Sequence, residues 1–119
     1  MNRTILSLSL IVLIGATRVE AHAFLKDAEP GVGSTVQTSP NEVRIRFTEN
    51  IEPAFGSIQV FDTSGKEVDK RDVHLDRSDR ALLHVSLPQP RAGIYKVLWR
   101  VVSVDTHVTN GSFTFRVSR

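Results

Sequence analysis

Residues 94–117 read IYKVLWRVVSVDTHVTNGSFTFRV and contain two stretches with the alternation of β-strands. Every second residue from Tyr95 to Val101 is aromatic or β-branched, and every second residue from Phe113 to Val117 is apolar. A period of two with one apolar face predicts two strands, each with one side in a core and one in water. Trp99 and Tyr95 are expected in that core, with the tyrosine hydroxyl at its rim.

The segment between these strands, VDTHVTNG at 104–111, is rich in short polar residues. Asn110-Gly111 is a strong turn dipeptide, so we expect a polar turn that extends to Gly111. Asp105 and His107 lie within it, where rigid strands give way to a loop, which is the usual place for a site on a β scaffold. The alternative is a structural turn in which Asp105 caps the backbone.

Further alternating segments at 43–47, 58–61 and 81–87 are separated by Pro and Gly residues, and no segment has a convincing helical period. About seven short strands predict an all-β sandwich of Greek-key type. His74 lies in a charged connection, and His84 lies on the polar face of its strand. We expect both to be exposed strand histidines.

Residues 1–21 have the pattern of a signal peptide: a short positive start, an uncharged apolar run, and small residues at positions 19 and 21, which a signal peptidase reads. The apolar run at 5–16 is shorter than the roughly 20 residues that span a bilayer, which argues against the alternative of an uncleaved anchor. Cleavage after Ala21 leaves residues 22–119, enough for one small domain.

The mature chain would have 13 basic and 12 acidic residues, a balance that gives no support to nucleic-acid binding. It contains no cysteine, and the only methionine of the sequence is Met1. The mature protein would therefore contain no sulfur, and its stability has to come from its core.

His22 would be the first residue after cleavage. A free α-amine and the imidazole of the same residue can close a chelate ring on one metal ion, although a histidine can also occupy this position by chance. Together with Asp105 and His107 it would form a nitrogen-rich donor set without sulfur, which suits Cu(II). Zn(II) accepts similar ligands. Glu49, at the end of its strand, is either an outer partner of the metal or a plain surface acid.

Several motifs resemble the bacterial periplasmic copper-resistance protein C (CopC) family over essentially the whole mature chain. They are HAFL at 22–25 with a Pro-Gly turn soon after, RFTEN at 46–50, GIYKVLWRVVS at 93–103, DTH at 105–107 and GSFTF at 111–115.

The resemblance implies an immunoglobulin-like β-sandwich that binds one Cu(II) through the amine and imidazole of His22, Asp105 and His107, with Glu49 near the metal. It also implies a monomeric periplasmic copper carrier or buffer in copper resistance or uptake, without catalysis, and an inner-membrane copper transporter of the CopD type as partner. Some members hold Cu(I) in a methionine-rich loop, but residues 56–82 contain no methionine.

Two other functions remain open on the sequence. A copper monooxygenase can also use an N-terminal histidine chelate, but this mature domain is small and Asp105 would fill a position that oxygen needs. A metal-free adhesion or packing module is the second alternative, and it would retain no copper after desalting.

Overall fold

The computed structural model describes residues 23–118, so the predicted signal peptide and His22 lie outside the described residues. The elements in chain order are β1 (Leu25–Glu29), β2 (Thr35–Val36), β3 (Glu42–Phe47), the short 3₁₀ turn η2 (Pro53–Phe55), β4 (Ser57–Phe61), β5 (His74–Leu75), β6 (Leu82–Ser86), β7 (Gly93–Val102) and β8 (Val108–Val117).

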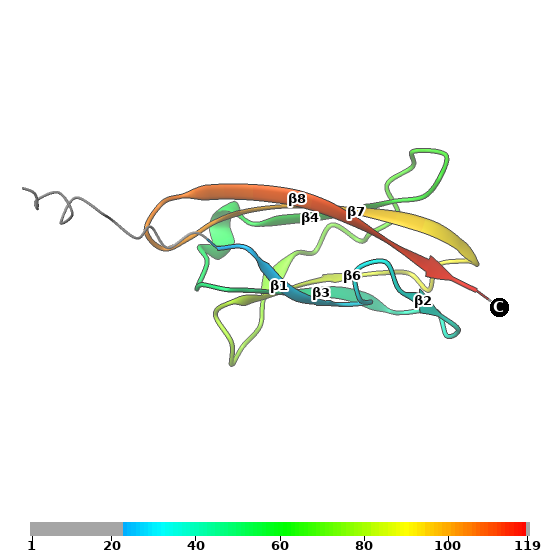
Figure 1. Ribbon diagram of the computed structural model, residues 1–119, viewed down its shortest axis with the longest axis horizontal. Helices are drawn as coiled ribbons and strands as arrows, with labels where there is room; N and C mark the ends of the chain where they lie inside the picture. Colours follow the sequence, from blue (N-terminus) through cyan, green and yellow to red (C-terminus); the bar gives the residue numbers. More distant parts are fainter. Residues whose placement is uncertain (1–22, 119) are drawn as a thin grey trace, which may run out of the picture.

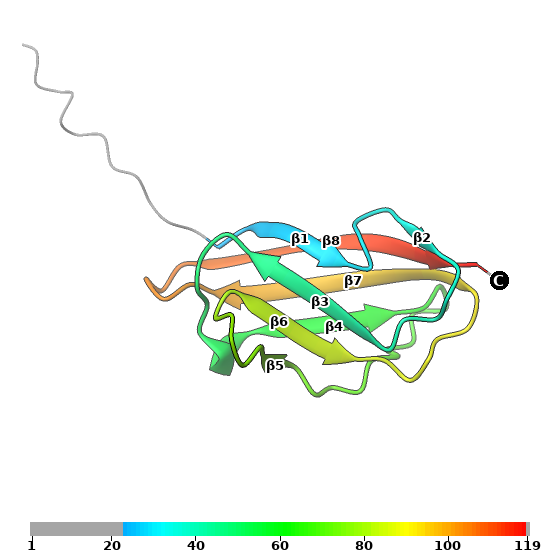
Figure 2. The same ribbon diagram turned by 90° about the horizontal axis from the view of Figure 1, so that it is seen from below.

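These strands form two sheets of four, in the orders β1-β3-β6-β5 and β2-β8-β7-β4. Every pairing is antiparallel except that of β2 with β8. Figure 1 shows the two layers edge-on, and Figure 2 shows β3 and β6 side by side across the other sheet. The prediction of an all-β, immunoglobulin-like sandwich is confirmed. In the described part of the chain, no helix is long and apolar enough to cross a membrane.

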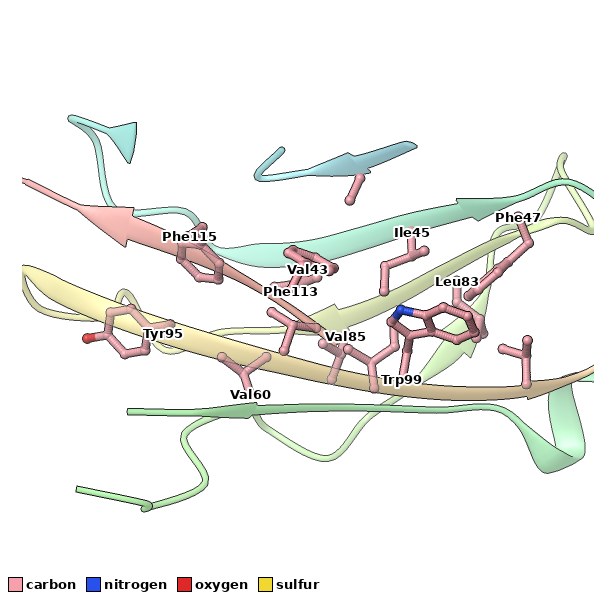
Figure 3. Close-up of a cluster of buried hydrophobic side chains, with 14 of the residues drawn as sticks. Val43, Ile45, Phe47, Val60, Leu83, Val85, Tyr95, Trp99, Phe113 and Phe115 are labelled. Carbon is pink, nitrogen blue, oxygen red and sulfur yellow. The ribbon is translucent and has the colours of Figure 1, made fainter. Parts of the chain in front are cut away.

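The alternation of β7 and β8 directs their apolar residues between the sheets, as predicted. Trp99 is 7% exposed and Tyr95 is 6% exposed, so both belong to the core. The Trp99 ring meets Phe47 of the opposite sheet edge-on, with the ring centres 5.2 Å apart, and Figure 3 shows it among Ile45, Leu83 and Phe47. The Tyr95 hydroxyl reaches the rim and donates to the carbonyl oxygen of Arg91 (2.7 Å).

The prediction of a turn that extends to Gly111 is wrong, because β8 already begins at Val108. Strands β7 and β8 stay paired to their ends, with Val102 opposite Val108 and Trp99 opposite Gly111. An added Cβ on Gly111 would lie 2.7 Å from Cζ2 of Trp99. Gly111 is therefore needed for the close approach of an aromatic ring and not for a turn.

Candidate metal site

The polar turn proper has five residues, 103–107, at the end of the sandwich where β7 passes into β8 (Figure 1). The backbone N–H of Ser103 donates to the carbonyl oxygen of His107 (2.9 Å), and the N–H of Thr106 donates to that of Ser103 (2.8 Å). Thr106 has a φ of 72°, the left-handed conformation that lets the chain reverse within so few residues. This compact turn holds both Asp105 and His107 between two long strands.

The side chains of Asp105 and His107 lie together, as the sequence predicted for a common site. The Nδ1 atom of His107 is 3.2 Å from Oδ1 of Asp105, and both side chains are about two-fifths exposed. The Ser103 hydroxyl, which donates to Asp105, lowers the pKa of that carboxyl below its ordinary value, and His107 adds to the effect. An ionised carboxylate beside an accessible imidazole is a pair of donors suited to a divalent cation.

Ser103 is the residue that sequence reasoning missed. Ser103 is 1% exposed. Its hydroxyl group donates a hydrogen bond to Oδ1 of Asp105. The Oγ atom of Ser103 also accepts a hydrogen bond from the backbone N–H of His107 (3.2 Å). The available signal was a small hydroxyl residue two positions before an aspartate, at the end of a strand, where such side chains commonly bond to nearby backbone.

The described chain begins at the same end of the molecule. Ala23 is fully buried, and its carbonyl oxygen accepts a hydrogen bond from Oγ1 of Thr109, two residues beyond His107. Phe24 is paired with Thr48 through N–H to Oγ1 (3.0 Å) and through its own carbonyl oxygen to the Thr48 N–H (2.8 Å). The chain that follows His22 is thus fixed beside the start of β8, although His22 itself lies outside the described residues.

Glu49 lies in the segment that borders this turn. The carbonyl oxygen of Asn50 accepts the N–H of Val104 (3.2 Å), and Ile51 forms an isolated bridge with Ser103. The side chain of Glu49 is exposed. Its role as an outer partner of a metal stays a prediction.

The prediction that His84 is exposed is wrong. This residue is 8% exposed, with Nδ1 3.0 Å from Oε1 of Glu42 and Nε2 2.8 Å from Oδ1 of Asp76. The β5 strand pairs with β6 at this point, and the exposed His74 stacks on the His84 ring at 5.1 Å between ring centres. His84 is therefore covered by the His74 side chain from the adjacent strand β5 and by Asp76 in the loop after it, which alternation along β6 does not reveal.

Each ring nitrogen of His84 thus lies within hydrogen-bond distance of a carboxylate oxygen, one from Glu42 and one from Asp76. The pKa of Asp76 is lowered to about 2, first by the backbone N–H of Ser78 and then by the hydrogen bond to His84. With both of its nitrogens already bonded, His84 ties β3, β6 and the loop after β5 together. This arrangement explains the histidine without a metal.

Among the described residues, no group of three or more histidine, aspartate or glutamate side chains is placed to hold a metal ion. Asp105 and His107 are two of the predicted ligands, and the third, His22, lies outside the described residues. The donor atoms of the Asp105 carboxylate and the His107 imidazole are oxygen and nitrogen, which fit Cu(II) or Zn(II).

The fold and the paired aspartate and histidine together define the class of protein: a small immunoglobulin-like β-sandwich with a candidate metal site in the turn at one end. The CopC domain model matches residues 25–118. The chain belongs to the CopC family.

Two curated relatives and one solved structure illustrate the similarity. Copper resistance protein C of Pseudomonas syringae pv. tomato is 32% identical over 98% of this chain and 98% of its own. Copper transport protein CutJ of Bacillus subtilis is 29% identical over 83% of this chain, which spans only 18% of the length of CutJ. The crystal structure of CopC from Methylosinus trichosporium OB3b superposes with a TM-score of 0.76 at 35% identity, covering 82% of this chain and 94% of that one.

Proposed function

We propose that the protein is a periplasmic Cu(II)-binding protein that carries or buffers copper in copper resistance or uptake. The observation that carries the proposal is the pairing of Asp105 with His107 at the end of the sandwich where the described chain begins. Membership of the CopC family supports it, since named relatives are a copper resistance protein and a copper transport protein.

One Cu(II) ion is bound by the α-amine and imidazole of His22, the carboxylate of Asp105 and the imidazole of His107. These are three nitrogen donors and one oxygen donor, a set that suits the tetragonal preference of Cu(II). Zn(II) can use the same groups, but the affinity order of divalent ions favours copper where both are available. The ion is cargo, and the protein holds it without changing it.

Residues 1–21 are a signal peptide that is cleaved after Ala21 on export, and residues 22–119 are the functional domain. Cleavage creates the amine of His22, so the complete site exists only in the exported protein. N-terminal sequencing of the exported protein tests this step, and a mature chain that begins elsewhere than His22 would contradict it.

The exported monomer delivers its ion to a membrane copper transporter of the CopD type and performs no catalysis. Asp105 as a copper ligand occupies a position that an oxygen-activating enzyme leaves open. The measurement that separates the two functions is peroxide formation from ascorbate by the copper-loaded protein, compared with the same amount of free copper. A carrier forms no more peroxide than free copper, and sustained excess formation would favour the monooxygenase.

The sharpest test of the site adds one glycine in front of His22. This change keeps every side chain but turns the amine into an amide, which is a far poorer donor. Cu(II) titration of the unmodified and extended proteins should differ by orders of magnitude in affinity, each tenfold being about 1.4 kcal/mol. Their unfolding curves without metal should coincide.

Equal affinities of the two proteins would show that the amine is not a ligand. Electron paramagnetic resonance of the unmodified protein should report one nitrogen-dominated Cu(II) site per chain. Affinity should also fall as the pH drops from roughly 8 to 6, because the amine and imidazoles must lose protons to bind.

A further inference from the structure

Two hydroxyl groups flank the turn that carries Asp105 and His107. Ser103 stands at its start, and Thr109 stands in β8 just beyond its end. Ser103 is buried and Thr109 is half-buried. The Ser103 hydroxyl bonds to the side chain of Asp105, which is a proposed copper ligand. The Thr109 hydroxyl bonds to the backbone of Ala23, the residue after the proposed ligand His22.

The Ser103 hydroxyl links the two ligands of the turn. Its proton goes to Oδ1 of Asp105, while its oxygen accepts the backbone N–H of His107 at 3.2 Å. Because a hydroxyl has one proton, the bond to Asp105 commits the donor and leaves the lone pairs for the N–H. The carboxylate is thereby tied to the backbone of the histidine, and both are held before any ion arrives.

The Thr109 hydroxyl performs the corresponding task for the other half of the site. It donates to the carbonyl oxygen of Ala23, a residue 86 positions earlier in the sequence. Ala23 is fully buried and directly follows His22. The bond fixes the backbone adjacent to His22 against β8, two residues from His107.

We propose that Ser103 and Thr109 are positioning residues for the two halves of the copper site, Ser103 for the turn ligands and Thr109 for the N-terminal chelate. This inference rests on the proposed function. Neither hydroxyl touches the ion; each orients a ligand. Groups that orient metal ligands in this way commonly change metal affinity by about 10- to 100-fold when they are removed.

The test uses variants that remove a hydroxyl while changing little else. Thr109→Val keeps the shape and the β-branch, and Thr109→Ser keeps the hydroxyl, so these two form a matched pair. Ser103→Ala removes the link between the turn ligands, and Ser103→Thr restores a hydroxyl. Each variant is prepared both with His22 at its N-terminus and with one extra glycine, and each is titrated with Cu(II).

Thr109→Val should lose about 10- to 100-fold in Cu(II) affinity in the unmodified protein. It should lose little in the extended protein, because the chelate that it orients is already absent there. Ser103→Ala should weaken binding in both backgrounds and alter the paramagnetic resonance spectrum, because it acts on Asp105 and His107. Thr109→Ser and Ser103→Thr should stay close to the parent protein.

Thermal unfolding without metal checks that every variant is folded at the temperature of the titration. Tight binding by the parent together with unchanged binding by Thr109→Val and Ser103→Ala overturns this inference alone. An equal loss for Thr109→Val in both backgrounds also overturns it, since the effect would then be structural. Failure of the unmodified parent to bind copper overturns the proposed function, and this inference with it.

Discussion

Gly111→Ala tests the reason why a glycine stands in the middle of a long strand. A glycine in a strand is ordinarily a weakness, so replacing it with alanine is expected to stabilise a protein by about 0.4–1 kcal/mol where the backbone permits. At Gly111 the new Cβ would lie 2.7 Å from Cζ2 and 2.9 Å from Cε2 of Trp99. Such contacts are too short, so the ring or the strand has to move.

The indole cannot move freely, because it is 7% exposed and packs against Phe47 of the opposite sheet. Overpacking of this kind costs roughly 1–3 kcal/mol, and each 1 kcal/mol lowers the unfolding midpoint by about 4–8 °C for a domain of this size. Gly111→Ala should therefore lower the midpoint and also shift the fluorescence of Trp99, the only tryptophan.

Gly31→Ala is the matched control. Its new Cβ would meet Cβ of Ser34 at 3.6 Å, an ordinary contact, so the midpoint should stay unchanged or rise. A Gly111→Ala protein as stable as the parent, with unchanged fluorescence, would refute the argument from ring packing. If the argument is correct, Gly111→Ala should cost less in a Trp99→Leu background, because the clash is gone.

Three further predictions concern the site, the metal and the acid limit of stability. Asp105→Ala and His107→Ala should each weaken Cu(II) binding with little change in the unfolding of the apo protein, whereas Trp99→Ala should cost about 3–5 kcal/mol of stability; equal apo destabilisation in all three variants would make the turn structural. Ascorbate with a Cu(I) chelator should strip the copper readily, because Cu(I) prefers sulfur donors and the mature chain has none; retention of Cu(I) against a modest chelator would contradict this. The lowered pKa of Asp76 means that its contribution to stability is complete above its ordinary value of 3.8 and is lost as the pH falls toward about 2, so Asp76→Asn should flatten the acid-unfolding profile in that range, and an unchanged profile would argue against the hydrogen bonds that Asp76 accepts from Ser78 and His84.

The faces of β7 and β8 could be predicted from sequence because alternation is a local property, and it assigned Trp99 and Phe115 correctly to the core. The length of the turn could not be predicted in the same way. Asn110-Gly111 is a turn signal only if the strands have already separated, and whether they have depends on pairing with β7. The Trp99 ring on the neighbouring strand β7 leaves no room for a side chain at position 111. Local residue propensities carry no information about such a contact between strands.

The same distinction applies to the polar residues. Asp105 and His107 stand close in sequence and in space, so their pairing could be anticipated. The two carboxylates bonded to His84 come from Glu42 on β3 and Asp76 after β5. Nothing in the sequence around either residue indicates that it lies next to His84. Ser103 looks like an ordinary serine at the end of a strand until its two hydrogen bonds are known.

The two halves of the proposed site differ in when they become available. The turn half is built from residues 103–107 and is complete as soon as β7 and β8 pair. The N-terminal half needs a peptide bond to be cut, because His22 has no free amine while residue 21 precedes it. A precursor that had not been exported would therefore lack the amine donor and offer copper only the side chains of the proposed site. Under the proposed function, tight copper binding is thus restricted by chemistry to the compartment in which cleavage occurs, without a conformational switch.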